Sequence, residues 1–121
     1  MRGPAQPIAF VTSTDVERIV RRDFPEEQFF AVTKVLQEYG SEKWHREPDR
    51  VRTAALKLSG GTTEGLRRAI DAAKRDYRDV LAWAEYPKCT KTGFWSHKLA
   101  FKEREQLYAE DWQQYQAWLR K

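Results

Sequence analysis

Apolar side chains recur at three- and four-residue intervals along five segments of the chain, and this spacing restricts the fold more than any other feature. The third segment carries the complete pattern on one helical face: Val51, Ala54, Ala55 and Leu58. Prolines and glycines separate the segments, as expected for residues that end helices. The pattern therefore predicts an all-α fold, in the form of an irregular five-helix bundle.

The stop and start signals give approximate bounds for these helices. We expect them over residues 15–24, 25–39, 48–59, 63–85 and 99–121. The first has a capping-box spacing between Thr14 and Glu17. Residues 1–12 are expected to form an irregular arm, and residues 13–121 a single helical domain, since a chain of 121 residues has room for one core.

The last segment offers side chains for that core. Trp112 and Tyr115 lie on its apolar stripe, so both are predicted to be core anchors. Asp111 borders this stripe and is expected to form a structural ion pair with Arg75 or Arg78. The last helix is therefore expected to pack across the others.

Composition argues against several classes of protein. No apolar run approaches the ~18–20 residues of a membrane-spanning helix. The apolar run from Ile8 to Val11 is too short for the core of a signal peptide. Cys89 is the single cysteine, so an intramolecular disulfide is impossible. We therefore expect a cytoplasmic protein with no membrane partner.

The net charge of +4 is concentrated in one part of the sequence. Residues 86–102 contain four lysines and no acidic residue, and they include the connection 87–98 before the last helix. We expect residues 87–98 to be a long Lys-rich loop, which a charged partner would meet first. The candidate partner-binding residues are Lys88, Lys91, Phe94, Trp95, His97, Lys98 and Lys102.

This loop allows three interpretations. Trp95 can anchor a protein partner. The lysines can contact phosphates while Phe94 or Trp95 stacks on a base of a nucleic acid. Alternatively, both rings turn inward and fill the core beneath the loop. The sequence contains no recognised nucleic-acid-binding motif, which places a protein partner ahead of a nucleic acid.

A glycine-rich turn before the fourth segment is a candidate anion site, because backbone N–H groups at a helix N-terminus hold anions. The Lys-Ser/Thr ending of a P-loop is missing from this turn, however. A helix stop followed by an N-cap explains the same residues. The candidate anion-binding residues are Gly60, Gly61, Thr62, Thr63, Arg67 and Arg68.

No combination of side chains with the spacing of a catalytic site emerges. Cys89 has His97 eight residues away as a possible base, and His45 is the other histidine. These three residues fall short of the four N or S ligands of a structural zinc site. The sequence therefore predicts no catalytic residues, no metal and no cofactor.

Three short runs resemble a group of small bacterial proteins. They are residues 21–25 (RRDFP), 72–87 (AAKRDYRDVLAWAEYP) and 111–116 (DWQQYQ). The resemblance covers most of residues 14–121, and it implies an all-helical fold and a bacterial source. It implies no activity and no catalytic residues.

Together these features predict a non-enzymatic protein-interaction domain of the bacterial cytoplasm. It is expected to bind a protein partner, or a second copy of itself, through a helix face and the loop 87–98. The alternative is a weak, sequence-tolerant nucleic-acid-binding protein that uses the same basic loop.

Overall fold

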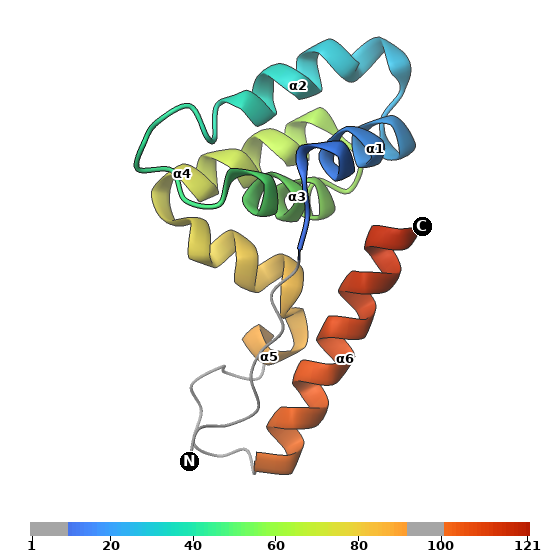
Figure 1. Cartoon of the computed structure of the whole chain (residues 1–121), viewed down its shortest axis with the longest axis vertical. Helices are drawn as coiled ribbons and strands as arrows, with labels where there is room; N and C mark the ends of the chain where they lie inside the picture. Colours follow the sequence, from blue (N-terminus) through green and yellow to red (C-terminus); the bar gives the residue numbers. More distant parts are fainter. Residues whose placement is uncertain (1–9, 92–100) are drawn as a thin grey trace.

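The computed structural model describes residues 10–91 and 101–121, and it is mostly helical (Figure 1). Within these residues it contains no strand, which confirms the all-α prediction. The elements are α1 (Ser13–Asp23), η1 (Glu26–Gln28), α2 (Phe29–Gln37), α3 (Pro48–Leu58), α4 (Thr63–Glu85), α5 (Pro87–Lys91) and α6 (Phe101–Arg120). None of the described helices is both long and apolar enough to cross a membrane.

The helix count differs from the five that the sequence predicts, because α5 lies inside the expected loop 87–98. Its five residues are too few to show an apolar periodicity, so the sequence pattern does not reveal it. The other bounds agree within a few residues, and the N-terminus of α3 at Pro48 is confirmed. The first helix begins earlier than predicted, because Asp15 accepts a hydrogen bond from the backbone N–H of Thr12 at 2.9 Å.

The core lies where α3 packs along α4, with α1 and α2 covering them (Figure 1). Tyr39 and Tyr115 are the largest of its fully buried side chains. Tyr115 is therefore a core anchor, as predicted, whereas Trp112 is only partly buried and packs at the edge of the core. Aliphatic side chains from four helices fill the interior: Ile19, Val32, Val51, Leu66, Ile70 and Val80.

Helix α4 bends sharply at Asp76, although the apolar pattern predicts one continuous helix over residues 63–85 (Figure 1). Asp76 has an extended backbone, with φ −158° and ψ 103°. Its Oδ1 accepts the backbone N–H of Arg78 at 3.0 Å, so Asp76 caps the second part of α4. The bend directs residues 77–85 toward α5 and α6.

The ion pair predicted for Asp111 is absent among the described residues. Arg78 pairs with Asp76 instead, and Arg75 has no acidic partner in the described part of the chain. Asp111 is fully buried, and its carboxylate accepts the backbone N–H groups of Lys88 at 3.1 Å and Cys89 at 3.0 Å. Asp111 therefore holds the first turn of α5 against α6, since the first N–H groups of a helix lack partners within it.

Candidate functional site

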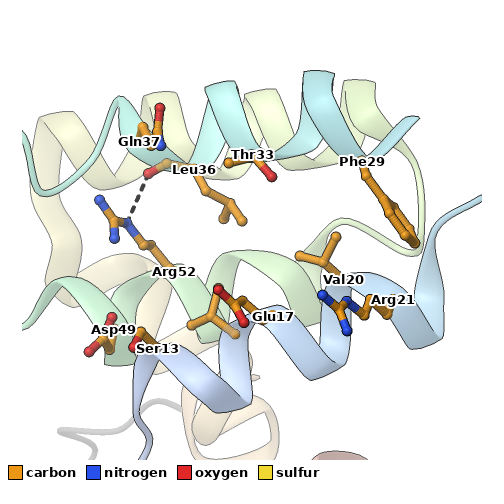
Figure 2. A pocket seen from close by; sticks show the side chains of 11 residues that line it. Ser13, Glu17, Val20, Arg21, Phe29, Thr33, Leu36, Gln37, Asp49 and Arg52 are labelled. Carbon is orange, nitrogen blue, oxygen red and sulfur yellow. Dashed lines mark hydrogen bonds between the residues drawn. The ribbon is translucent and has the colours of Figure 1, made fainter. Parts of the chain in front are cut away.

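A groove of about 320 Å³ runs between α1 and α2, with α3 at one end (Figure 2). Its lining comes from three helices: Ser13, Val16, Glu17, Val20, Arg21, Phe29, Thr33, Leu36, Gln37, Asp49 and Arg52.

The floor of the groove is apolar, and its edges are polar. Val16, Val20 and Leu36 form the floor and belong to the buried core. Figure 2 shows Ser13 and Asp49 at one end, and Phe29 with Arg21 at the other. The end with Asp49 also holds the guanidinium of Arg52, and Arg21 provides the guanidinium at the other end.

Arg52 fixes the position of α2 beside α3. Its Nε donates a hydrogen bond to the carbonyl oxygen of Leu36 at 3.0 Å (Figure 2) and another to that of Tyr39 at 2.8 Å. These carbonyl groups lie at the C-terminal end of α2, where a cation satisfies acceptors that lack helical partners. Gly40 follows with φ +106°, and a Cβ there would come within 2.7 Å of Arg52 and 2.9 Å of Pro48. These contacts hold the C-terminal end of α2 beside α3, at the end of the groove that contains Asp49.

Of the predicted partner-binding residues, Lys88, Lys91 and Lys102 lie within the described part of the chain, and all three are exposed. Lys88 pairs with the carboxylate of Glu110 on α6. Phe94, Trp95, His97 and Lys98 lie outside the described residues. Helix α5 lies at the opposite end of the fold from the groove (Figure 1), so the groove and α5 do not form one site.

The glycine-rich turn forms a helix stop and an N-cap. Gly60 and Gly61 have φ values of +63° and +80°, which end α3. Thr62 Oγ1 then accepts the backbone N–H of Gly65 at 3.0 Å. Arg67, on the first turns of α4, donates to Glu38 at 3.2 Å. Thr63 Oγ1 contacts Gln28, and Arg68 is exposed.

The side chains considered for thiol or metal chemistry lie apart in the structure. Cys89 is buried on α5 beside Asp111, and His97 lies outside the described residues. His45 is buried in the loop before α3, where its Nδ1 accepts the backbone N–H of Gly40 at 2.8 Å. In the described part of the chain, no group of three or more His, Cys, Asp or Glu side chains is placed to hold a metal ion.

Cys89 is expected to be unreactive while the protein is folded. Burial, together with the neighbouring carboxylate of Asp111, raises the pKa of the Cys89 thiol to about 12, so almost no thiolate exists at neutral pH. Labelling with Ellman's reagent at about pH 8 should be at least ~100-fold slower for the native protein than for the protein in urea. Equal labelling rates in the two states would show that the thiol is accessible.

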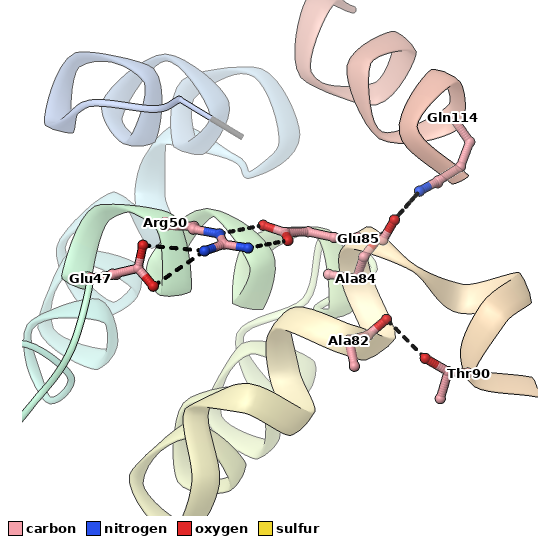
Figure 3. A network of polar contacts seen from close by, with 7 residues as sticks. All are labelled: Glu47, Arg50, Ala82, Ala84, Glu85, Thr90 and Gln114. Atoms are coloured by element: carbon pink, nitrogen blue, oxygen red, sulfur yellow. Dashed lines mark hydrogen bonds and ion pairs between the residues drawn. The ribbon is translucent and has the colours of Figure 1, made fainter. Parts of the chain in front are cut away.

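A buried network joins the helices around Glu85, which is only 4% exposed (Figure 3). Both oxygens of Glu85 accept hydrogen bonds from Arg50, at 2.9 Å and 2.7 Å, and Arg50 also contacts Glu47 at 3.2 Å. These bonds hold the pKa of Arg50 above its ordinary value. Gln114 on α6 donates to the carbonyl of Ala84 at 3.3 Å. The network therefore connects α3, α4 and α6.

Sequence reasoning missed this network because its members are far apart along the chain. Glu85 is 35 residues from Arg50. The nearby hydroxyl of Tyr115 is buried without a hydrogen-bond partner among the described residues, and burial raises its pKa. Since both oxygens of Glu85 are occupied by Arg50, the arrangement stabilises the fold and presents no acid–base pair to a substrate.

In comparisons with protein-family models, curated proteins and solved structures, nothing matches this chain. The functional assignment therefore depends on the surfaces of the chain itself.

Proposed function

We propose that the chain is a non-enzymatic protein-interaction domain of the bacterial cytoplasm. Its partner presents a short amphipathic helix that binds in the groove between α1 and α2. The observation that carries the proposal is the shape and chemistry of this groove: an apolar floor, polar edges and walls from two helices.

The size of the groove supports a helix of about two turns. Eight residue steps separate Ser13 from Arg21 on α1, which corresponds to about 12 Å at 1.5 Å per residue. Two or three apolar side chains at helical spacing then reach Val16, Val20 and Leu36. Side chains that fill such a floor contribute most of the affinity of a small interface.

The charges at the ends of the groove support one orientation of that helix. Asp49 favours the positive end of a helix dipole and Arg21 favours the negative end, while Arg52 beside Asp49 directs its Nε to carbonyl oxygens at the end of α2 (Figure 2). The N-terminus of the bound helix then lies beside Asp49 and Ser13, so the helix runs parallel to α1. Basic residues in its first turn add to the attraction by Glu17 and Asp49.

A peptide library displayed on phage provides the test. Selection on the immobilised chain with helical peptides of about 15 residues should enrich sequences with apolar residues at i, i+3, i+4 and i+7. Thr33→Trp with Gln37→Trp should block the groove, because both positions are exposed on its edge. Affinity for the selected peptides should fall at least about tenfold, measured by fluorescence anisotropy.

Lys34→Trp is the matched control, because Lys34 is exposed on the same helix and does not line the groove. It should leave peptide affinity unchanged. Peptides that bind the blocked variant as tightly as the unchanged chain would contradict the groove as the binding surface. A chain that elutes as a dimer and dissociates in the blocked variant would identify a second copy as the occupant instead.

The segment 87–98 remains a second predicted contact surface. Lys91 is exposed at the end of α5, and Lys102 is exposed on α6. These lysines favour an acidic region of the same protein partner, which would reach α5 while its helix occupies the groove. The nucleic-acid alternative for this segment stays a prediction as well.

A further inference from the structure

A second hollow of about 390 Å³ lies where the loop before α3 meets the bend of α4. It is separate from the groove between α1 and α2, since the two share no lining residue. Its lining combines aromatic rings with four cationic side chains and one carboxylate: Tyr39, Trp44, Arg46, Ala73, Lys74, Arg75, Asp76, Tyr77 and Arg78.

Trp44 is a large ring held in a fixed position on the surface. It is 65% exposed, which is unusual for the side chain with the largest apolar area. Its ring meets the ring of His45 edge-on, with centroids 4.2 Å apart, and His45 stacks on Tyr39 at 4.5 Å. The buried hydroxyl of Tyr39 donates to the carbonyl of Arg46 at 2.7 Å. These contacts order the loop that carries Trp44.

Two of the cations in the hollow are already neutralised. Lys74 contacts Glu38 at 3.1 Å, and Arg78 contacts Asp76 at 3.0 Å. Arg46 and Arg75 have no acidic partner in the described part of the chain, and both are exposed. A ring with open surface therefore lies beside two guanidinium groups whose charge is not balanced locally.

We propose that this hollow binds single-stranded nucleic acid, with one base stacked on Trp44 and the adjacent phosphates on Arg46 and Arg75. An aromatic ring next to basic groups is the arrangement by which proteins bind single strands without reading their sequence. A guanidinium forms two parallel hydrogen bonds with a phosphate, which favours the arginines for this role. The site is independent of the proposed protein-binding groove.

The bend at Asp76 contributes to the site. It turns Tyr77 and Arg78 toward the same hollow as Trp44, although these residues come from separate parts of the sequence. Toward the start of α4, the carboxylates of Glu38 and Asp71 contact Arg67 and Lys74, so the charges of this part of the helix are balanced. The cations available to a phosphate at this hollow are therefore Arg46 and Arg75, which have no acidic contact in the described part of the chain.

The experiment measures binding of fluorescein-labelled oligo-dT and oligo-U of about 12 nucleotides by anisotropy at about 50 mM salt. Trp44→Ala should weaken binding about 5- to 150-fold, the cost of losing one stacked base. Trp83→Ala is the matched control, since Trp83 is 46% exposed on α4 and does not line the hollow. It should leave affinity unchanged.

Arg46 and Arg75 provide a second, independent test, because both are exposed and their replacement does not disturb the core. The double variant Arg46→Gln with Arg75→Gln should make the plot of log binding constant against log salt concentration less steep by about 1.4. Each contact to a single-strand phosphate contributes about 0.7 to that slope, and the variant removes two such contacts. Arg18→Gln with Arg120→Gln removes the same charge elsewhere and should leave the slope unchanged.

Two results would overturn the proposal. One is the absence of any anisotropy change with either oligonucleotide at low salt, where charge-driven binding is strongest. The other is binding of an oligo-glutamate peptide as tight as that of the oligonucleotides and insensitive to Trp44→Ala, which would identify an acidic protein segment as the ligand.

Discussion

Replacing Glu85 by alanine is expected to lower the free energy of unfolding by about 3–5 kcal/mol, measured by urea denaturation. Glu85 is almost fully buried, and both of its oxygens accept hydrogen bonds from Arg50 (Figure 3). Removing the carboxylate leaves the half-buried guanidinium of Arg50 without its main partner. A buried charge that has lost its partner destabilises the fold strongly, whereas replacing a whole buried ion pair by apolar side chains often changes the stability little.

Glu47 provides the matched control, because it contacts the same guanidinium from an exposed position. Glu47→Ala should cost less than about 1 kcal/mol, since solvent screens an exposed ion pair. Glu85→Gln, which keeps the shape and one acceptor, should fall between the two. Equal destabilisation by Glu85→Ala and Glu47→Ala would show that burial does not determine the strength of this network.

Local signals in the sequence predict most of the helix bounds. Pro48 opens α3, Thr62 caps α4 and Gly40 has the left-handed backbone that follows a helix. Each signal acts within about one turn of its own residue, so it is visible without knowledge of the fold. The all-α class follows from these bounds together with the apolar periodicity.

The features that escaped prediction depend on contacts between distant segments or on competition between two signals. Helix α5 is capped by Asp111, which lies 22 residues beyond Cys89. The apolar stripe of α4 continues on both sides of Asp76, so periodicity predicts a straight helix there. The side chain of Asp76 nevertheless forms a new N-cap within α4, and aspartate is one of the residues preferred at N-caps.

The groove and the hollow beside Trp44 could not be predicted from the sequence, for a further reason. Along the sequence, the excess positive charge lies in residues 86–102. The basic residues of α4 are not visible as an excess, because α4 contains an equal number of acidic residues. In the structure, Glu38 and Asp76 contact Lys74 and Arg78, which leaves Arg75 without an acidic contact in the described residues. The groove between α1 and α2 arises from packing, so neither helix reveals it alone.

Replacing Asp111 by alanine is the second change with a large expected effect. Its buried carboxylate accepts the backbone N–H groups of Lys88 and Cys89 in the first turn of α5. Loss of the acceptor for a buried donor costs about 1–3 kcal/mol, so with two donors urea denaturation should show a loss of about 2–6 kcal/mol. Asp111→Asn retains one acceptor and should lose less.

The same variant should release α5 before the rest of the protein unfolds, because Asp111 holds this short helix against α6. Ellman's reagent should then label Cys89 at least about tenfold faster in Asp111→Ala than in the unchanged chain under native conditions. Glu110→Ala is the control, since Glu110 contacts the exposed Lys88 side chain from the adjacent position on α6. It should cost less than about 1 kcal/mol. If both variants label Cys89 at the same rate, the buried carboxylate is not what keeps α5 in place.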